Sequence, residues 1–134
     1  MRVFLDTNVL VSAFSARGLC ADLFRTVVAK DELLTGEVNL VELRRVLADR
    51  FRASPHQLDV VERQLENHTI VPRPTVSSTL AIRDPDDAWV LASALVGGAE
   101  LLVTGDQDLL AVASQITIPV LTPRAAWERL QGPG

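Results

Sequence analysis

Two aspartates stand directly after apolar runs that have the character of buried strands. Asp6 follows the run that ends at Leu5, and Asp106 follows residues 101–105. An ionised carboxylate beside the core is costly unless a partner compensates its charge. In a parallel sheet, ligands bind beyond the carboxyl ends of the strands, where the strand order reverses. Both aspartates are therefore expected at such an edge.

Three further acids are expected at the same edge. Asp108 lies two residues beyond Asp106. Asp87 lies in the first turn of the helix expected before strand 101–104, and Glu42 lies near the start of the helix after the second strand. Oxygen ligands without cysteine or clustered histidine favour Mg²⁺ or Mn²⁺ over zinc. The pattern predicts metal-assisted hydrolysis by an activated water.

Other catalytic chemistries find little support in the sequence. Cys20 is the only cysteine, and His56 and His68 fall on or beside a middle helix, away from the acidic edge. The sequence lacks the motif of a Ser or Cys nucleophile, a Gly-rich dinucleotide fingerprint and a phosphate-loop lysine. Hydrolysis at a metal site is the chemistry that remains.

Each acid also has a purely structural interpretation. Asp6 could cap a helical turn over residues 7–14. Asp87 could be an acid favoured by the helix dipole, and Glu42 alone would be a solvent-facing helix residue. Asp106 and Asp108 could be ordinary turn residues. The joint placement of the five acids favours the functional interpretation.

The composition is that of a globular protein. Of the 134 residues, 48% are hydrophobic and 22% are charged, and the net charge is −4. These values predict one domain, residues 1–134, with a substantial core. No apolar run approaches the roughly 18–20 residues of a membrane span, and no secretory leader is evident, so a cytoplasmic location without membrane contact is expected.

Apolar runs alternate with segments of helical periodicity, which predicts βαβ units. The expected fold is a three-layer α/β/α sandwich around a mostly parallel sheet of four to five strands. The expected strands are Val3–Leu5, Leu33–Thr35, Thr69–Val71, Leu101–Thr104 and Pro119–Leu121. The expected helices cover Asn39–Phe51 and begin at Ser54, Asp84 and Thr122, and Pro72–Arg83 is expected as a long polar loop.

Four segments together resemble the PIN domain family: LDTNVLVSAF, VELRRVL, DPDDAWVLASAL and LLVTGDQDLL. The resemblance covers essentially the whole chain and is closest to the branch that contains the VapC-type toxins of toxin–antitoxin pairs. It implies a parallel-sheet α/β fold and a Mg²⁺- or Mn²⁺-dependent nuclease of the kind that usually acts on RNA. It also implies a homodimer and a small antitoxin partner.

The resemblance assigns roles to particular residues. Its acidic quartet falls on Asp6, Glu42, Asp87 and Asp106, with Asp108 as an auxiliary metal ligand. The quartet would hold one or two ions and perform the catalysis.

Polar and basic residues complete the expected site. Asn8 and Thr104 match positions that support the site in this family. Arg17, Arg44 and Arg45 are candidates for contacting the RNA backbone, although a solvated helix face is the more common explanation of clustered arginines.

Two other classes of protein compete with the nuclease interpretation. One is a non-catalytic PIN-like module that binds metal or nucleic acid. The other is an acid-site α/β phosphatase or receiver domain, which carries paired acids at the first strand and a lysine on a late one. Here Asp6 is followed by Thr7 and Asn8, and the only lysine, Lys30, precedes the second strand. Those differences count against the second class.

Overall fold

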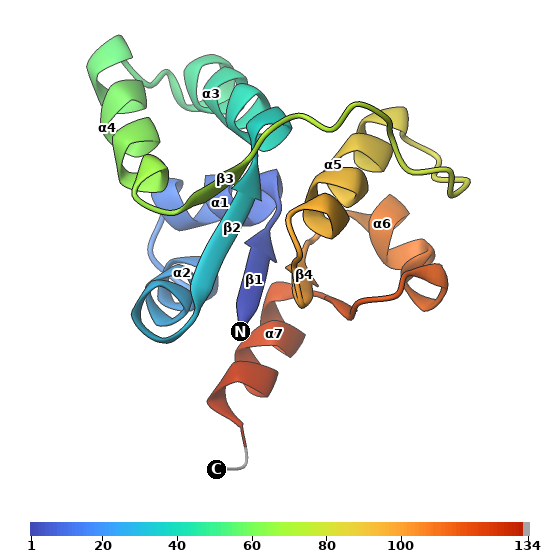
Figure 1. The fold of residues 1–134 in the computed structure, drawn as a ribbon. Helices are drawn as coiled ribbons and strands as arrows, with labels where there is room; N and C mark the ends of the chain where they lie inside the picture. The colour runs from blue at the N-terminus through green and yellow to red at the C-terminus, as the bar shows by residue number, and fades with distance from the viewer. Residues whose placement is uncertain (133–134) are drawn as a thin grey trace.

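The computed structural model describes residues 1–132, which form a parallel five-stranded sheet between two layers of helices (Figure 1). The strands are β1 (Arg2–Leu5), β2 (Glu32–Gly36), β3 (Thr69–Val71), β4 (Leu101–Val103) and β5 (Val120–Leu121). Each predicted strand end is correct to within one residue. The predicted α/β/α sandwich is thus confirmed, with five strands that are all parallel.

The strand order is β3-β2-β1-β4-β5. The chain builds outward from β1 through β2 to β3, and then returns to the other side of β1 to add β4 and β5. The order therefore reverses between β1 and β4, which is the position at which such sheets bind ligands. Asp6 and Asp106 follow these two strands.

Residues 1–132 also form seven α-helices and a 3₁₀ turn, the last helix following β5. They are α1 (Thr7–Ser15), α2 (Leu19–Lys30), α3 (Glu37–Phe51), α4 (Pro55–Glu66), α5 (Pro85–Val96), α6 (Gln107–Ala111), the turn Ala113–Gln115 and α7 (Pro123–Gln131). Alternate strand residues pack into two cores. Val3 and Leu5 face the core that includes α1–α4 and α7, whereas Phe4 faces the core under α5 and α6.

The helix starts predicted at Ser54, Asp84 and Thr122 are correct because capping residues mark them, whereas α3 begins at Glu37, two residues before the predicted Asn39. Ser54 and Gln57 form a capping box at α4. Asp84 caps α5 by accepting a hydrogen bond from Asp86 N at 3.0 Å, and Thr122 caps α7. Helix α2 was missed, because its cap is Gly18, which offers no side-chain oxygen. Within residues 1–132, no helix combines the length and apolar character that a bilayer crossing requires.

Candidate active site

Asp6 joins β1 to α1 and is only 4% exposed. Its Oδ1 accepts hydrogen bonds from Thr7 N at 2.7 Å and from Asn39 Nδ2 at 2.9 Å. Its Oδ2 accepts from Thr104 Oγ1 at 2.7 Å and from Asn8 Nδ2 at 3.4 Å. Asp6 therefore has both predicted positions. Its carboxylate caps α1, and it lies where the strand order of the sheet reverses, which we call the switch point.

The electrostatic balance at Asp6 has opposing contributions. Burial raises the pKa of its carboxyl above the ordinary value, and the negative charge of Asp106 raises it further. The hydrogen bonds from Thr104, Thr7 and Asn39 lower the pKa and oppose this effect. The hydrogen-bond donors therefore stabilise the buried carboxylate of Asp6, but its pKa stays above the ordinary value.

The carboxyl ends of β1 and β4 are tied together by side chains. The Thr104 hydroxyl donates to Asp6 and accepts from Asp106 N at 2.9 Å. Asn8 Oδ1 accepts from Gly105 N at 2.9 Å. Thr104 and Asn8 therefore connect the loops that carry the two strand-end aspartates.

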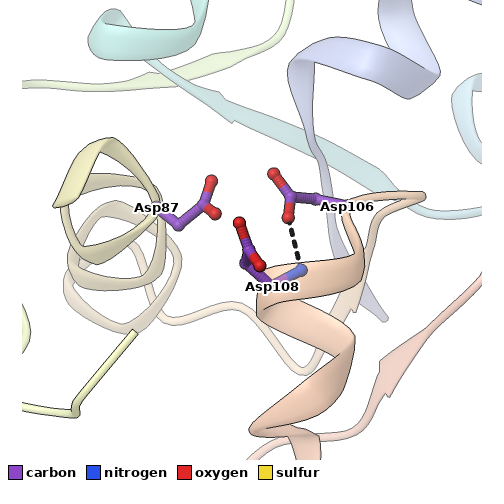
Figure 2. Close-up of side chains that lie close together, drawn as sticks. All are labelled: Asp87, Asp106 and Asp108. Carbon is purple, nitrogen blue, oxygen red and sulfur yellow. Dashed lines mark hydrogen bonds between the residues drawn. The ribbon is translucent and has the colours of Figure 1, made fainter. Parts of the chain in front are cut away.

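Asp87, Asp106 and Asp108 form a cluster in which one carboxylate oxygen from each residue lies within 4.8 Å of the others. Figure 2 shows Asp87 projecting from α5 toward the other two, which belong to the start of α6. Asp106 Oδ1 accepts from Asp108 N at 2.8 Å, so this residue also caps α6. The cluster comes from two segments of the chain that the sheet edge brings together.

Asp87 differs from Asp6 in lacking donors. It is 6% exposed, and no hydrogen-bond donor within residues 1–132 reaches its buried Oδ2. Burial, then the neighbouring Asp106 carboxyl and the charge of Asp6, raise the pKa of Asp87 to about 8. Three crowded carboxylates with a buried oxygen that no donor satisfies suit a hard divalent cation, which supplies positive charge and accepts oxygen ligands.

Asp108 has a basic neighbour. Arg83, at the end of the loop before α5, places Nε 3.2 Å from Asp108 Oδ1 while its own side chain is 88% exposed. Solvent weakens such a pair, so it compensates only part of the cluster's charge.

Glu42 lies apart from the cluster of three. It is half-buried on α3, where it lines a groove together with Asp86 of α5. Burial raises its pKa first, and the charge of Asp6 adds to this, whereas Arg45 lowers it. The charge of Glu42 therefore interacts with that of Asp6.

The three arginines expected at the nucleic acid have different surroundings. Arg44 Nη1 lies 2.8 Å from Glu62 Oε1 and 3.7 Å from Asp59 Oδ1, so its charge is directed toward α4. Arg45 lines the groove beside Glu42. Arg17 is exposed in the turn between α1 and α2.

Asn39 is a further polar residue of the site, which the sequence did not predict, and it is fully buried. Its Nδ2 donates to Asp6 Oδ1 and to Thr7 Oγ1, both at 2.9 Å, and its Oδ1 accepts from Gly36 N at 3.2 Å. A Cβ at Gly36 would lie 2.7 Å from Asn39 Oδ1, so only glycine leaves room for this contact. The available signal was a polar amide in the first turn of an otherwise apolar helix face.

The fold and the acidic edge define an α/β protein with carboxylates at the point where strand order reverses. The chain belongs to the PIN domain family, whose model matches residues 2–108. None of the curated protein sequences compared with the chain matches it significantly.

Solved structures of toxin–antitoxin complexes have a similar fold. VapBC2 from Rickettsia felis, solved bound to a DNA fragment from its promoter, is 13% identical, with 91% of this chain and 98% of that chain covered and a TM-score of 0.63. A toxin–antitoxin complex from Klebsiella pneumoniae is 21% identical, with 90% and 97% covered and a TM-score of 0.64. VapBC-1 from nontypeable Haemophilus influenzae is 16% identical, with 92% and 99% covered and a TM-score of 0.65. At these identities the likeness establishes the fold alone.

Proposed function

We propose that this chain is a Mg²⁺- or Mn²⁺-dependent endoribonuclease and the toxin of a toxin–antitoxin pair. The observation that carries the proposal is the convergence of Asp87, Asp106 and Asp108 at the switch point, with the buried Asp87 Oδ2 unsatisfied. Membership of the PIN domain family supports it.

The proposed metal ligands are the three clustered aspartates, with Asp6 beside them and Glu42 across the edge. With a divalent ion bound by these residues, the site would supply a water of lowered pKa and positive charge beside a scissile phosphate. The chain's own residues set the geometry. Thr104, Asn39 and Asn8 hold the Asp6 carboxylate in one orientation through hydrogen bonds, which keeps a charged ligand fixed before substrate arrives.

The proposed partners are RNA, a small antitoxin protein and a second copy of the chain. The antitoxin rests on the toxin–antitoxin complexes among the similar structures. RNA rests on the resemblance of the sequence motifs, and the homodimer has the same basis. All three are proposals for this chain.

The test is cleavage of a mixed-sequence RNA by purified protein in Mg²⁺, in Mn²⁺ and in excess EDTA. We expect cleavage only with the ions, and a loss of orders of magnitude in Asp106→Asn, which keeps the helix cap because asparagine also caps well. Asp49→Asn, an exposed acid on α3, is the matched control and should cleave like the parent. Cleavage that persists in EDTA would overturn the proposal, whereas RNA binding without cleavage would indicate a non-catalytic module.

A further inference from the structure

A groove of about 280 Å³ lies between α3 and α5. Its lining includes Glu37, Glu42 and Arg45 from α3, Asp86 and Trp89 from α5, and Arg73 from the segment after β3. Figure 1 shows that segment running from β3 past the start of α3 toward α5. The proposed catalytic roles use only one of these residues, Glu42.

The groove combines acidic residues with basic and aromatic ones. Both helices begin at the carboxyl edge of the sheet, as helices in βαβ units do. On α3, Arg45 follows Glu42 by one turn, and on α5, Trp89 follows Asp86 by nearly one turn. One turn is about 5.4 Å along a helix. Glu42, whose pKa is raised in part by the charge of Asp6, and Asp86, which directly precedes Asp87, line the groove and place it next to the acidic edge, with Arg45 and Trp89 one turn further along their helices.

The guanidinium group of Arg73 lies on an aromatic side chain of the groove. Arg73 places its guanidinium carbon 4.1 Å from the centroid of the Trp89 ring. Its backbone N–H donates to Glu37 Oε1 at 3.3 Å, which fixes the segment against α3. In the part of the chain that the structure describes, neither Arg73 nor Arg45 forms an ion pair, in contrast to Arg44. A guanidinium stacked on an aromatic ring, with a second arginine in the same groove, suits a nucleotide, whose base can stack and whose phosphate can accept from an arginine.

We propose that this groove is a subsite for one unpaired nucleotide of the RNA substrate, next to the scissile phosphate. The base stacks on the platform made by Arg73 and Trp89, and Arg45 contacts the backbone phosphate. Unpaired bases stack on aromatic rings and on guanidinium planes in single-strand recognition. The inference rests on the proposed ribonuclease function, and it specifies that the substrate is single-stranded at this position.

Tryptophan fluorescence tests the subsite without any cleavage. The chain has two tryptophans, and Trp127 lies on α7 outside the groove lining, packed against the core that faces away from α5. Trp127→Phe leaves Trp89 as the only reporter, and Trp89→Phe is the matched control. In EDTA at low salt, a single-stranded RNA oligonucleotide should change the emission of Trp127→Phe and leave that of Trp89→Phe unchanged. A duplex of the same sequence should give a much smaller change, because its bases are already stacked.

Variants of Arg73 measure how much the stacking contact contributes to RNA affinity. Arg73→Gln should bind the labelled oligonucleotide about tenfold more weakly, a loss in the range of one stacked base. Arg73→Lys should recover only part of this, since lysine restores charge without a planar group. Arg63→Gln removes an exposed charge from α4 and should bind like the parent. Thermal melts of each variant verify the fold.

The outcomes separate the subsite from the nuclease function. If the parent cleaves RNA while the Trp89 emission and the Arg73→Gln affinity do not change, the subsite is wrong and the nuclease stands. If RNA alters Trp89 emission and Arg73→Gln binds weakly while no condition gives cleavage, the subsite stands and the catalytic proposal fails. An equal response to duplex and single strand would overturn the single-stranded specificity.

Discussion

At the residue scale, the buried aspartates of the site are compensated in different ways. Asp6 accepts four hydrogen bonds, whereas the buried Oδ2 of Asp87 accepts none from residues 1–132. From the sequence alone, both aspartates are expected to be repelled by neighbouring acids. This repulsion predicts that Asp6→Asn is neutral or stabilising without metal. The hydrogen bonds reverse this expectation, because an amide nitrogen at Asp6 would face a donor. Asp87 is the residue at which removal of charge relieves strain.

Asp87→Asn should therefore reduce the pH dependence of stability in metal-free protein. The raised pKa of Asp87, about 8, means that the folded state holds a proton that the unfolded state loses near pH 4. The free energy of unfolding of the parent should fall as pH rises between about 4 and 8, and level off above. Asparagine does not titrate, so the variant should be the more stable protein at pH 8–9 in EDTA. Thermal melts from pH 5 to pH 9 measure this, and parallel curves for the two proteins would refute the raised pKa.

Asp6→Asn should behave in the opposite way. Loss of one acceptor leaves a buried donor unsatisfied, which costs about 1–3 kcal/mol. Denaturant unfolding at pH 7 in EDTA gives the difference. A variant as stable as the parent would show that the hydrogen bonds to Asp6 contribute less than its charge costs.

At the element scale, the start of α3 positions the site. Asn39 lies in the first turn of α3 and connects the end of β2, through Gly36 N, to the carboxylate of Asp6 at the end of β1. The pairing of α3 with α4 is held at the surface by Arg44, which bonds Glu62 and Asp59. Helix α3 therefore carries the buried hydrogen bonds of Asn39 and the exposed ion pair of Arg44. We expect these two sets of contacts to contribute differently to stability.

Asn39→Ala should destabilise the protein by about 1–3 kcal/mol, because Gly36 N loses its acceptor and Asp6 loses a donor. If Asn39 also orients Asp6 for metal binding, the variant should need a higher Mg²⁺ concentration for half-maximal activity. Gln64→Ala, an exposed amide on α4, is the control for both measurements. Destabilisation with an unchanged Mg²⁺ requirement would limit Asn39 to a structural role.

The Arg44–Glu62 pair should contribute little to stability. Both side chains are substantially exposed, so a double-mutant cycle with Arg44→Gln and Glu62→Gln should give a coupling energy of about 0–1 kcal/mol. Because Glu62 and Asp59 compensate its charge, we expect Arg44→Gln to change the salt dependence of RNA binding less than Arg45→Gln does. A larger change in salt dependence for Arg44→Gln would indicate that the RNA binds nearer to α4.

At the scale of the whole molecule, local signals predicted the fold and part of the site. Apolar runs located the five strands, and caps such as Ser54 and Asp84 located helix starts, because these signals involve neighbouring residues. Helix α2 was missed because Gly18 caps without a side chain. The role of Asn39 and the platform of Arg73 on Trp89 depend on contacts between distant segments, which a single sequence does not specify.

The metal site is tested most directly by a calorimetric titration of Mn²⁺ into protein that has been stripped with EDTA and dialysed. We expect saturable binding of one or two ions to the parent, strong weakening in Asp106→Asn, and no change in the exposed control Asp49→Asn. Binding should release protons at pH 7, since the raised pKa of Asp87 leaves its carboxyl largely protonated without metal. Equal Mn²⁺ affinity in the parent and in Asp106→Asn would contradict a metal site at this edge of the sheet.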